Sequence, residues 1–166
     1  MSKILKLPFA FFSNKWNDLQ NFLEKMGNPP YIITDNLSLF LVETNQSLGN
    51  LTSVEGWVDL EESGIKSLGN LTSVGGSFNW AYCNIKSLGN LTSVGGHLFL
   101  YRSKLEDLGN LTSVGGDLGL TDSSIEDLGK LKYVGGDLDL RFTPVSKIYV
   151  EEEIRKMVDV KGKVYL

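Results

Sequence analysis

Residues of the types that carry out most enzyme chemistry are few in this sequence. His97 is the only histidine and Cys83 the only cysteine among 166 residues. Ser-His-Asp and Cys-His nucleophiles, and histidine-rich metal clusters, therefore lack a necessary member. Cys83 has no second cysteine to pair with, so the chain contains no disulfide framework. We interpret Cys83 as a small buried residue rather than as a nucleophile.

Carboxylates are the remaining candidates for chemistry, because a pair of them can act as acid and base or hold a cation. Glu61 adjoins Glu62, and Asp137 is two residues from Asp139, a spacing that places both on one face of a strand with Asp117. A cation site or a glycosidase-type pair is one interpretation. Solubility and protection of a strand edge are the other, which we favour. The glycines fit turns rather than a phosphate loop. We therefore expect no enzymatic activity, no metal and no cofactor.

A second set of residues has the chemistry of binding. Aromatic and arginine side chains are enriched in interface hot spots. The candidates for partner binding are Trp57, Tyr82, His97, Phe99, Tyr101, Arg102, Arg141 and Phe142. Several of them lie 20 or 40 residues apart, so a repeat of that period would bring them to one surface. Exposed aromatic residues on a sheet also pack across strands, which would explain them by stability alone.

A 20-residue repeat supplies that period. SLGNLTSVEG begins at Ser47, SLGNLTSVGG at Ser67 and Ser87, DLGNLTSVGG at Asp107, and DLGKLKYVGG at Asp127. A unit this short cannot bury its apolar face alone, so units stack and share one core. The sequence therefore predicts a solenoid of 20-residue coils.

The apolar pattern within a coil predicts where its strand lies. The inward positions of one coil are Leu98, Leu100, Leu105, Leu108, Leu111 and Val114. The spacing of two indicates a short strand, and the spacings of three indicate a tight or extended return path. Gly95 and Gly96 precede the strand, where we expect a sharp turn, and Gly109 marks a second bend.

The run Leu98, Leu100, Ser103, Leu105 and Leu108 resembles the shortest kind of leucine-rich repeat. The preceding Val-x-Gly-x-Leu-x-Leu stretch is similar to receptor L domains, which are β-helix relatives of these repeats. The resemblance covers Leu37 to Leu166 and implies a right-handed coil stack with one parallel β-sheet. The family's asparagine position is filled here by small residues, namely Ser63, Cys83, Ser103, Ser123 and Thr143. We expect these to form a weaker ladder than asparagine does, with a flatter solenoid.

The two ends are expected to be caps. Residues 1–36 are predicted to form an N-terminal cap, 37–143 the solenoid, and 144–166 a C-terminal capping coil. The cap helix is predicted over about 14–26, with Ser13 as N-cap and Gly27 as C-cap, because apolar residues recur there at helical spacing. It is interpreted as a lid on the first coil; a partner-binding or membrane-surface helix is the alternative.

Three further expectations concern the flanking coils. Residues 37–42 are predicted to form the first strand, with Leu39 and Leu41 facing inward. Ile148 is expected to continue the column of Leu48, Leu68, Leu88, Leu108 and Leu128. Residues 151–158 are predicted to form a short helix whose acidic start and basic end suit its dipole.

Composition narrows the partners. The net charge of −4 argues against general nucleic-acid binding, although an acidic mimic of nucleic acid is an alternative. No apolar stretch reaches the ~20 residues of a membrane span, and the first residues lack a clear signal-peptide cleavage site. We therefore expect the cytoplasm of the producing or host cell, where the repeated Asn-Leu-Thr sequences act as turns rather than glycosylation sites.

The outward strand positions differ in every coil, whereas the Leu-Gly-Asn-Leu-Thr-Ser-Val return path is almost constant. This contrast favours a non-enzymatic protein-interaction module that binds an unidentified protein through the variable sheet face, as a small microbial or viral adaptor or inhibitor would. A small-ligand or glycan binder using the same aromatic residues is the alternative. The terminal strand edge is expected to be open to pairing with a second copy.

Overall fold

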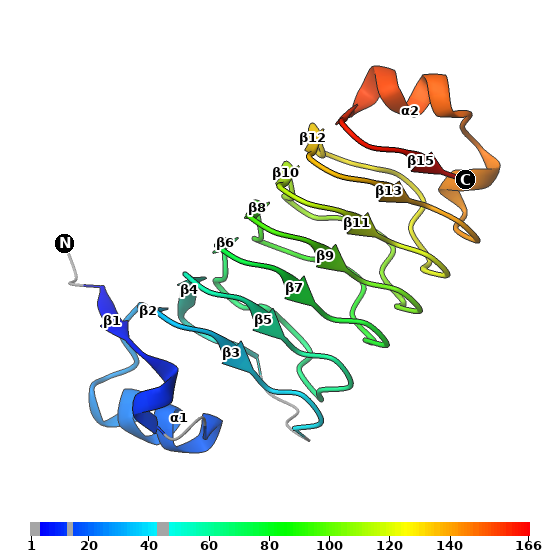
Figure 1. Ribbon diagram of the computed structural model, residues 1–166. Helices are drawn as coiled ribbons and strands as arrows, with labels where there is room; N and C mark the ends of the chain where they lie inside the picture. Colours follow the sequence, from blue (N-terminus) through cyan, green and yellow to red (C-terminus); the bar gives the residue numbers. More distant parts are fainter. Residues whose placement is uncertain (1–3, 13–14, 43–46) are drawn as a thin grey trace.

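Each repeat folds into one coil that contains two short strands, and each strand pairs in parallel with its equivalent in the neighbouring coil. A computed structural model describes residues 4–12, 15–42 and 47–166 of the chain. Successive coils stack into a β-solenoid with a short helix at either end (Figure 1). Equivalent residues pair at a separation of 20, as Val74 does with Val94, so the sequence repeat and the coil are the same unit.

Two parallel sheets run along the solenoid, where the resemblance to leucine-rich repeats had implied one. Among the described residues, sheet A contains β1 (Leu5–Leu7), β2 (Tyr31–Ile33), β4 (Leu51–Val54), β6 (Ser73–Val74), β8 (Ser93–Val94), β10 (Ser113–Val114), β12 (Tyr133–Val134) and β14 (Asp159–Val160), in that spatial order. Sheet B contains β3 (Leu37–Ser38), β5 (Val58–Asp59), β7 (Phe78–Asn79), β9 (Leu98–Phe99), β11 (Leu118–Gly119), β13 (Leu138–Asp139) and β15 (Val164–Tyr165). Sheet A forms because the Ser-Val end of each return path is extended and pairs in register.

One core of mainly aliphatic side chains, with aromatic residues such as Phe78 and Trp80, passes through all the coils. The six inward positions predicted for the central coil, from Leu98 to Val114, are each 0% exposed. Two assignments to inward positions are wrong. Leu41 is 56% exposed, because the first strand ends at Ser38 and Leu37 takes the inward place that pairs with Val58. Ile148 is 61% exposed, because the 3₁₀ turn η2 (Val145–Lys147) redirects the chain before it.

Glycine allows the coils to approach closely. A Cβ on Gly95 would overlap the carbonyl oxygen of Gly75 in the preceding coil, so this position has no room for a side chain. The expected second bend occurs at Gly109, whose φ of +58° lies in the left-handed region that glycine adopts at little cost. The repeat thus requires glycine for two reasons, contact between coils and backbone conformation.

The N-terminal cap consists of the 3₁₀ turn η1 (Phe9–Phe12), helix α1 (Trp16–Lys25) and the first two strands of sheet A. Its buried side chains include Trp16, Leu19 and Leu23, which belong to the same core as the coils. Gly27 has a φ of +79° just beyond the helix, which fits the predicted C-terminal cap. The predicted N-cap, Ser13, lies outside the described residues.

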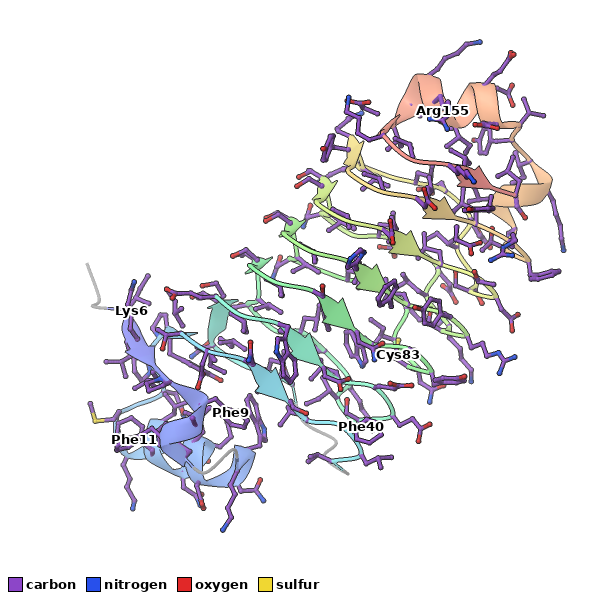
Figure 2. All side chains as sticks on the ribbon, in the orientation of Figure 1. Lys6, Phe9, Phe11, Phe40, Cys83 and Arg155 are labelled. Atoms are coloured by element: carbon purple, nitrogen blue, oxygen red, sulfur yellow. The ribbon has the colours of Figure 1, made fainter. Side chains whose placement is uncertain are left out.

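The C-terminal coil includes helix α2 (Glu151–Met157), close to the predicted position. Arg155, which is labelled in Figure 2, connects this helix to the last coil. Its Nη1 and Nη2 atoms donate to the carbonyl oxygens of Val160 and Gly162 at 2.8 Å, and its Nε donates to Glu151 Oε1 at 2.8 Å. No helix in the described part of the chain is both long and apolar enough to span a bilayer.

Candidate binding surface on sheet B

The outward residues of sheet B and the bend that follows it carry all eight candidate binding residues. We call this surface the sheet B face. Its centre is an aromatic stack along one coil: the rings of His97 and Phe99 lie 5.6 Å apart between centroids, and those of Phe99 and Tyr101 lie 5.4 Å apart. The stack joins residues of one coil at spacing two, Phe99 of β9 with His97 before the strand and Tyr101 after it, rather than residues of neighbouring strands. It forms a ridge on the sheet B face.

Arginine residues flank this ridge and pack on tyrosine rings. The guanidinium carbon of Arg102 lies 5.8 Å from the centre of the Tyr82 ring, and Arg102 Nε is 3.6 Å from Asp122 Oδ2. Arg141 lies 5.3 Å from the Tyr165 ring centre. Both guanidinium groups are therefore already engaged with a carboxylate or a ring of this chain.

Arg141 and Asp139 form the tightest ion pair of the sheet B face. Arg141 Nε and Nη2 donate to the two carboxylate oxygens of Asp139 at 3.0 and 2.6 Å. Burial alone would raise the pKa of Asp139, but the hydrogen bonds from Arg141 outweigh it and hold that pKa below its usual value. Asp139 is therefore ionised at neutral pH, and the pair adds no net charge to the surface.

The bend after sheet B holds bulky residues in an unusual backbone conformation. Six equivalent residues have a left-handed φ between +51° and +61°: Leu41, Glu62, Tyr82, Arg102, Asp122 and Phe142. This conformation costs an L-residue with a Cβ roughly 1–2 kcal/mol, and glycine or asparagine normally fills it. Phe142 is 77% exposed, so burial of its ring does not repay that cost.

A ladder of hydrogen bonds explains part of the variation on the sheet B face. Along the column of residue 57, a side chain in one coil accepts a hydrogen bond from the backbone N–H of the same position in the next coil. The acceptors are Asn36 Oδ1, Ser77 Oγ, His97 Nδ1, Asp117 Oδ1 and Asp137 Oδ1, at 2.7–3.1 Å. These residues differ in type but share an acceptor atom, so their variation is limited by structure. Trp57, whose indole only donates, departs from the rule.

The small-residue column does not provide the ladder that its position suggested. The hydroxyls of Ser63 and Ser123 are buried and find no hydrogen-bond partner in the described structure. Thr143 instead bonds within its own coil, donating to the Leu140 carbonyl oxygen at 2.6 Å. Cys83 of this column is buried, and burial raises the pKa of its thiol to about 11. A thiol in that state is a poor nucleophile at neutral pH, as expected for a packing residue.

Three hollows lie around the ridge. Groove 1, of about 330 Å³, contains Trp57, Asp59, Glu61, Asn79, Phe99 and Tyr101 among its lining residues. A cleft of about 590 Å³ lies over the bend and is lined by Tyr82, Tyr101, Arg102, Thr121, Asp122, Asp139, Arg141 and Phe142. Groove 2, of about 230 Å³, contains Phe99, Tyr101, Asp117, Gly119, Asp137, Asp139 and Tyr165 among its lining residues. Seven of the eight candidates thus line a hollow, whereas His97 stacks on the ridge.

Two residues important to this surface were missed from the sequence. Tyr165 pairs with Asp139 and so belongs to the same outward column as Phe99, although 26 residues separate the pair. Its signal was the Val-x-Gly-x-Val-x-Leu pattern from Val160, which sets that register. Gly119 is the other, because a Cβ there would lie 2.6 Å from a ring carbon of Tyr101. The absence of a side chain leaves room for groove 2.

Several carboxylates of the sheet B face accept hydrogen bonds from other groups of the chain. Asp117 and Asp137 belong to the hydrogen-bond ladder, and Asp139 pairs with Arg141. Within residues 4–12, 15–42 and 47–166, no group of three or more His, Cys, Asp or Glu side chains is arranged to hold a metal ion.

Comparison with protein-family models, with curated proteins and with solved structures found no match for this chain.

Proposed function

We propose that this protein is a non-enzymatic interaction module, related in type to leucine-rich repeats, whose sheet B face binds a partner protein. In this proposal it acts as a small adaptor or inhibitor. The observation that carries the proposal is the bend after sheet B, where each of six coils keeps a different large or charged side chain in a left-handed conformation.

The other bend of the same coils gives the comparison. There the left-handed position is glycine in every repeat, at Gly49, Gly69, Gly89, Gly109 and Gly129, with φ between +51° and +60°. The chain therefore uses the unstrained residue at this bend, where a Cβ on Gly69 or Gly109 would also lie within 2.7 Å of backbone atoms of the preceding coil. Retaining Tyr82, Arg102 and Phe142 at the strained bend supports a role for their side chains, because strained positions cluster at functional sites.

A glycan or small-ligand binder is the second candidate, and groove 1 favours it. The Trp57 ring is 44% exposed beside the amide of Asn79 and the carboxylates of Asp59 and Glu61. An aromatic face with polar groups at its rim suits stacking on a sugar ring. Binding to a glycan array, with no protein captured, would favour this candidate over a protein partner.

The test is capture of a partner from a lysate of the cells that produce the protein. Phe99→Ala with Tyr101→Ala should remove most of the affinity, since central anchors commonly contribute about 2 kcal/mol or more each. A matched control, Phe11→Ala with Tyr133→Ala, removes one exposed Phe and one exposed Tyr away from the sheet B face. Equal capture by both double variants, with both folded, would contradict the proposal.

A separate variant tests the alternative that the protein is an acidic mimic of nucleic acid. Glu106→Lys with Asp107→Lys reverses two charges on the coil edge, where Glu106 pairs with Lys86 at 2.7 Å. If binding were lost in this variant alone, the partner-binding surface would be the acidic coil edge and not the sheet B face.

A further inference from the structure

Groove 1 combines aromatic walls with negative charge. Asn79 Nδ2 donates to Glu61 Oε2 at 2.8 Å and to Asp59 Oδ1 at 3.4 Å, and the backbone N–H of Glu61 also donates to Asp59 Oδ1. All of these donors are neutral. Among the described residues that line groove 1, none is positively charged. The Asn79 amide and a backbone N–H thus hold both carboxylates in place without neutralising their charge.

Groove 2 repeats this combination on the other side of the ridge. Phe99 and Tyr101 supply its free ring faces, and Asp117 and Asp137 supply carboxylates. Asp139 and Tyr165 also line it but are engaged by the guanidinium of Arg141. Asp137 accepts hydrogen bonds from the backbone N–H of Lys163 at 2.7 Å and from the Tyr165 hydroxyl at 3.4 Å, which again are neutral donors. Both grooves therefore place acid groups beside aromatic faces.

The ridge between the grooves lies in a negative field. The pKa of Tyr101 is raised, first by burial and then by the carboxylates of Glu61, Asp139 and Asp117. These three groups come from three different coils, on both sides of β9. Asp139 is paired with Arg141, so a positive charge placed against the Tyr101 ring would be stabilised mainly by Glu61 from groove 1 and by Asp117 from groove 2.

We propose that grooves 1 and 2 hold guanidinium or ammonium side chains of a partner, so that the sheet B face recognises a basic protein segment. Rings attract cations through their faces, and carboxylates add charge-assisted hydrogen bonds. The two effects act together in each groove. This inference rests on the proposed function, which it deepens by naming the chemistry of the partner.

The spacing of the grooves indicates the form of that segment. Groove 1 lies over β7 and groove 2 over β11, two strands further along the sheet. Adjacent strands are about 4.8 Å apart, so the groove floors are separated by roughly 10 Å. A polyproline II segment rises about 3.1 Å per residue with three residues per turn, so side chains three apart share a face at roughly 9 Å. The occupant is then an extended segment with Arg or Lys at every third position.

Fluorescence anisotropy with labelled synthetic peptides tests this inference directly. The probe is a nine-residue peptide with arginine at every third position and proline between. One comparison peptide has glutamine in place of arginine, and another has the three arginines adjacent. We expect the periodic arginine peptide to bind, the glutamine peptide not to bind, and the adjacent-arginine isomer to bind about tenfold more weakly.

Matched variants separate groove recognition from general attraction to an acidic protein. Asp59→Asn with Glu61→Gln removes the carboxylates of groove 1 while keeping side-chain shape, and should weaken binding about tenfold. Asp18→Asn with Glu24→Gln makes the same charge change on α1 and should leave affinity within about twofold. Tyr101→Leu should weaken binding severalfold, because it removes the ring from both grooves.

Equal weakening by the two carboxylate variants, or none by either, would overturn the inference, as would equal binding of the two arginine isomers. The proposed function and the inference of a basic partner segment are tested independently of each other. A partner whose capture depends on Phe99 and Tyr101, combined with no arginine-peptide binding, would overturn only the cationic specificity. Binding of the peptide without any captured partner would leave the groove chemistry supported and the protein partner unsupported.

Discussion

His97 shows how a single position on the sheet B face serves stability and surface chemistry together. Its ring stacks on Phe99, and its Nδ1 accepts a hydrogen bond from the backbone N–H of Asp117 at 2.9 Å. Sequence comparison between coils shows only that this column varies. The residues of this column share an acceptor atom, and that property appears only once the coils are in register. The sequence alone therefore assigns His97 to binding and not to the hydrogen-bond ladder.

We predict that His97→Leu destabilises the protein by about 0.5–1.5 kcal/mol, because it removes the acceptor of a solvent-exposed hydrogen bond between coils. His97→Asn should restore most of that stability, since Asn36 fills the same role at the first coil. Urea denaturation of the two variants measures the difference. Equal midpoints would show that the ring stack, rather than the ladder, gives His97 its structural role.

Cys83 gives a prediction for alkaline pH. Its folded-state pKa, about 11, is raised from 9.0 by burial, so the thiol contributes full stability below about pH 9 and loses it as the pH rises through about 11. Two pKa units correspond to about 2–3 kcal/mol. Cys83→Ser, which installs the residue of the neighbouring coils, should lose that much less stability between pH 8 and 11. Parallel curves of unfolding free energy against pH for the two proteins would refute the buried-thiol assignment.

At the scale of the coil, the repeat predicted which side chains form the core but did not predict every bend and strand of the backbone. The inward columns around Leu98 and Leu108 followed from period and spacing alone. Leu41 was misplaced because alternation fits both Leu37–Leu39 and Leu39–Leu41, and only the left-handed bend at Leu41 decides between them. Sheet A was missed because each of its central strands is two residues long, too short to show alternation.

The candidate surface was predictable to the same extent. The period brought Tyr82 and Arg102, 20 residues apart, into contact, with the guanidinium carbon 5.8 Å from the ring centre. Grooves 1 and 2 depend on features without a periodic signal: the missing side chain of Gly119 and the fixed carboxylates of Asp59 and Glu61. Such local geometry is set by contacts between coils, which composition does not describe.

The inward and outward positions of the return path should differ sharply in stability. Leu108→Ala creates a cavity at a fully buried position and is expected to cost about 2–5 kcal/mol. Thr112→Ala removes an exposed hydroxyl that donates to the Thr92 carbonyl oxygen at 2.9 Å, and should cost about 1 kcal/mol or less. Thermal and urea unfolding of both variants check this contrast. Similar losses would mean that the ladder of hydroxyls on the return path matters as much as the core.

At the scale of the whole molecule, the N-terminal end protects the solenoid unevenly. Sheet A continues through β2 and β1, whereas sheet B stops at β3. The cap is tied to the first coil by Asp35, whose carboxylate oxygens accept from the backbone N–H groups of Phe9 and Ala10 at 2.6 and 2.9 Å. Phe40 and Leu41 remain exposed beyond β3. This end therefore depends on the cap to keep its core and its strand edge from other chains.

Deleting residues 1–30 should therefore produce aggregation rather than a shorter stable solenoid. The deletion removes β1 and the buried side chains of Trp16, Leu19 and Leu23, which uncovers Tyr31 and leaves β2 as an open edge. Uncovered apolar strand edges pair with other chains. Size-exclusion chromatography with light scattering and a thermal melt measure the outcome, and Asn17→Ala, on the exposed side of α1, is the control that should remain unchanged. If the truncated chain were soluble, monomeric and cooperative in melting, the first coil would need no lid. Helix α1 would then be the better candidate for a partner-binding element, because its apolar side chains would have no structural requirement.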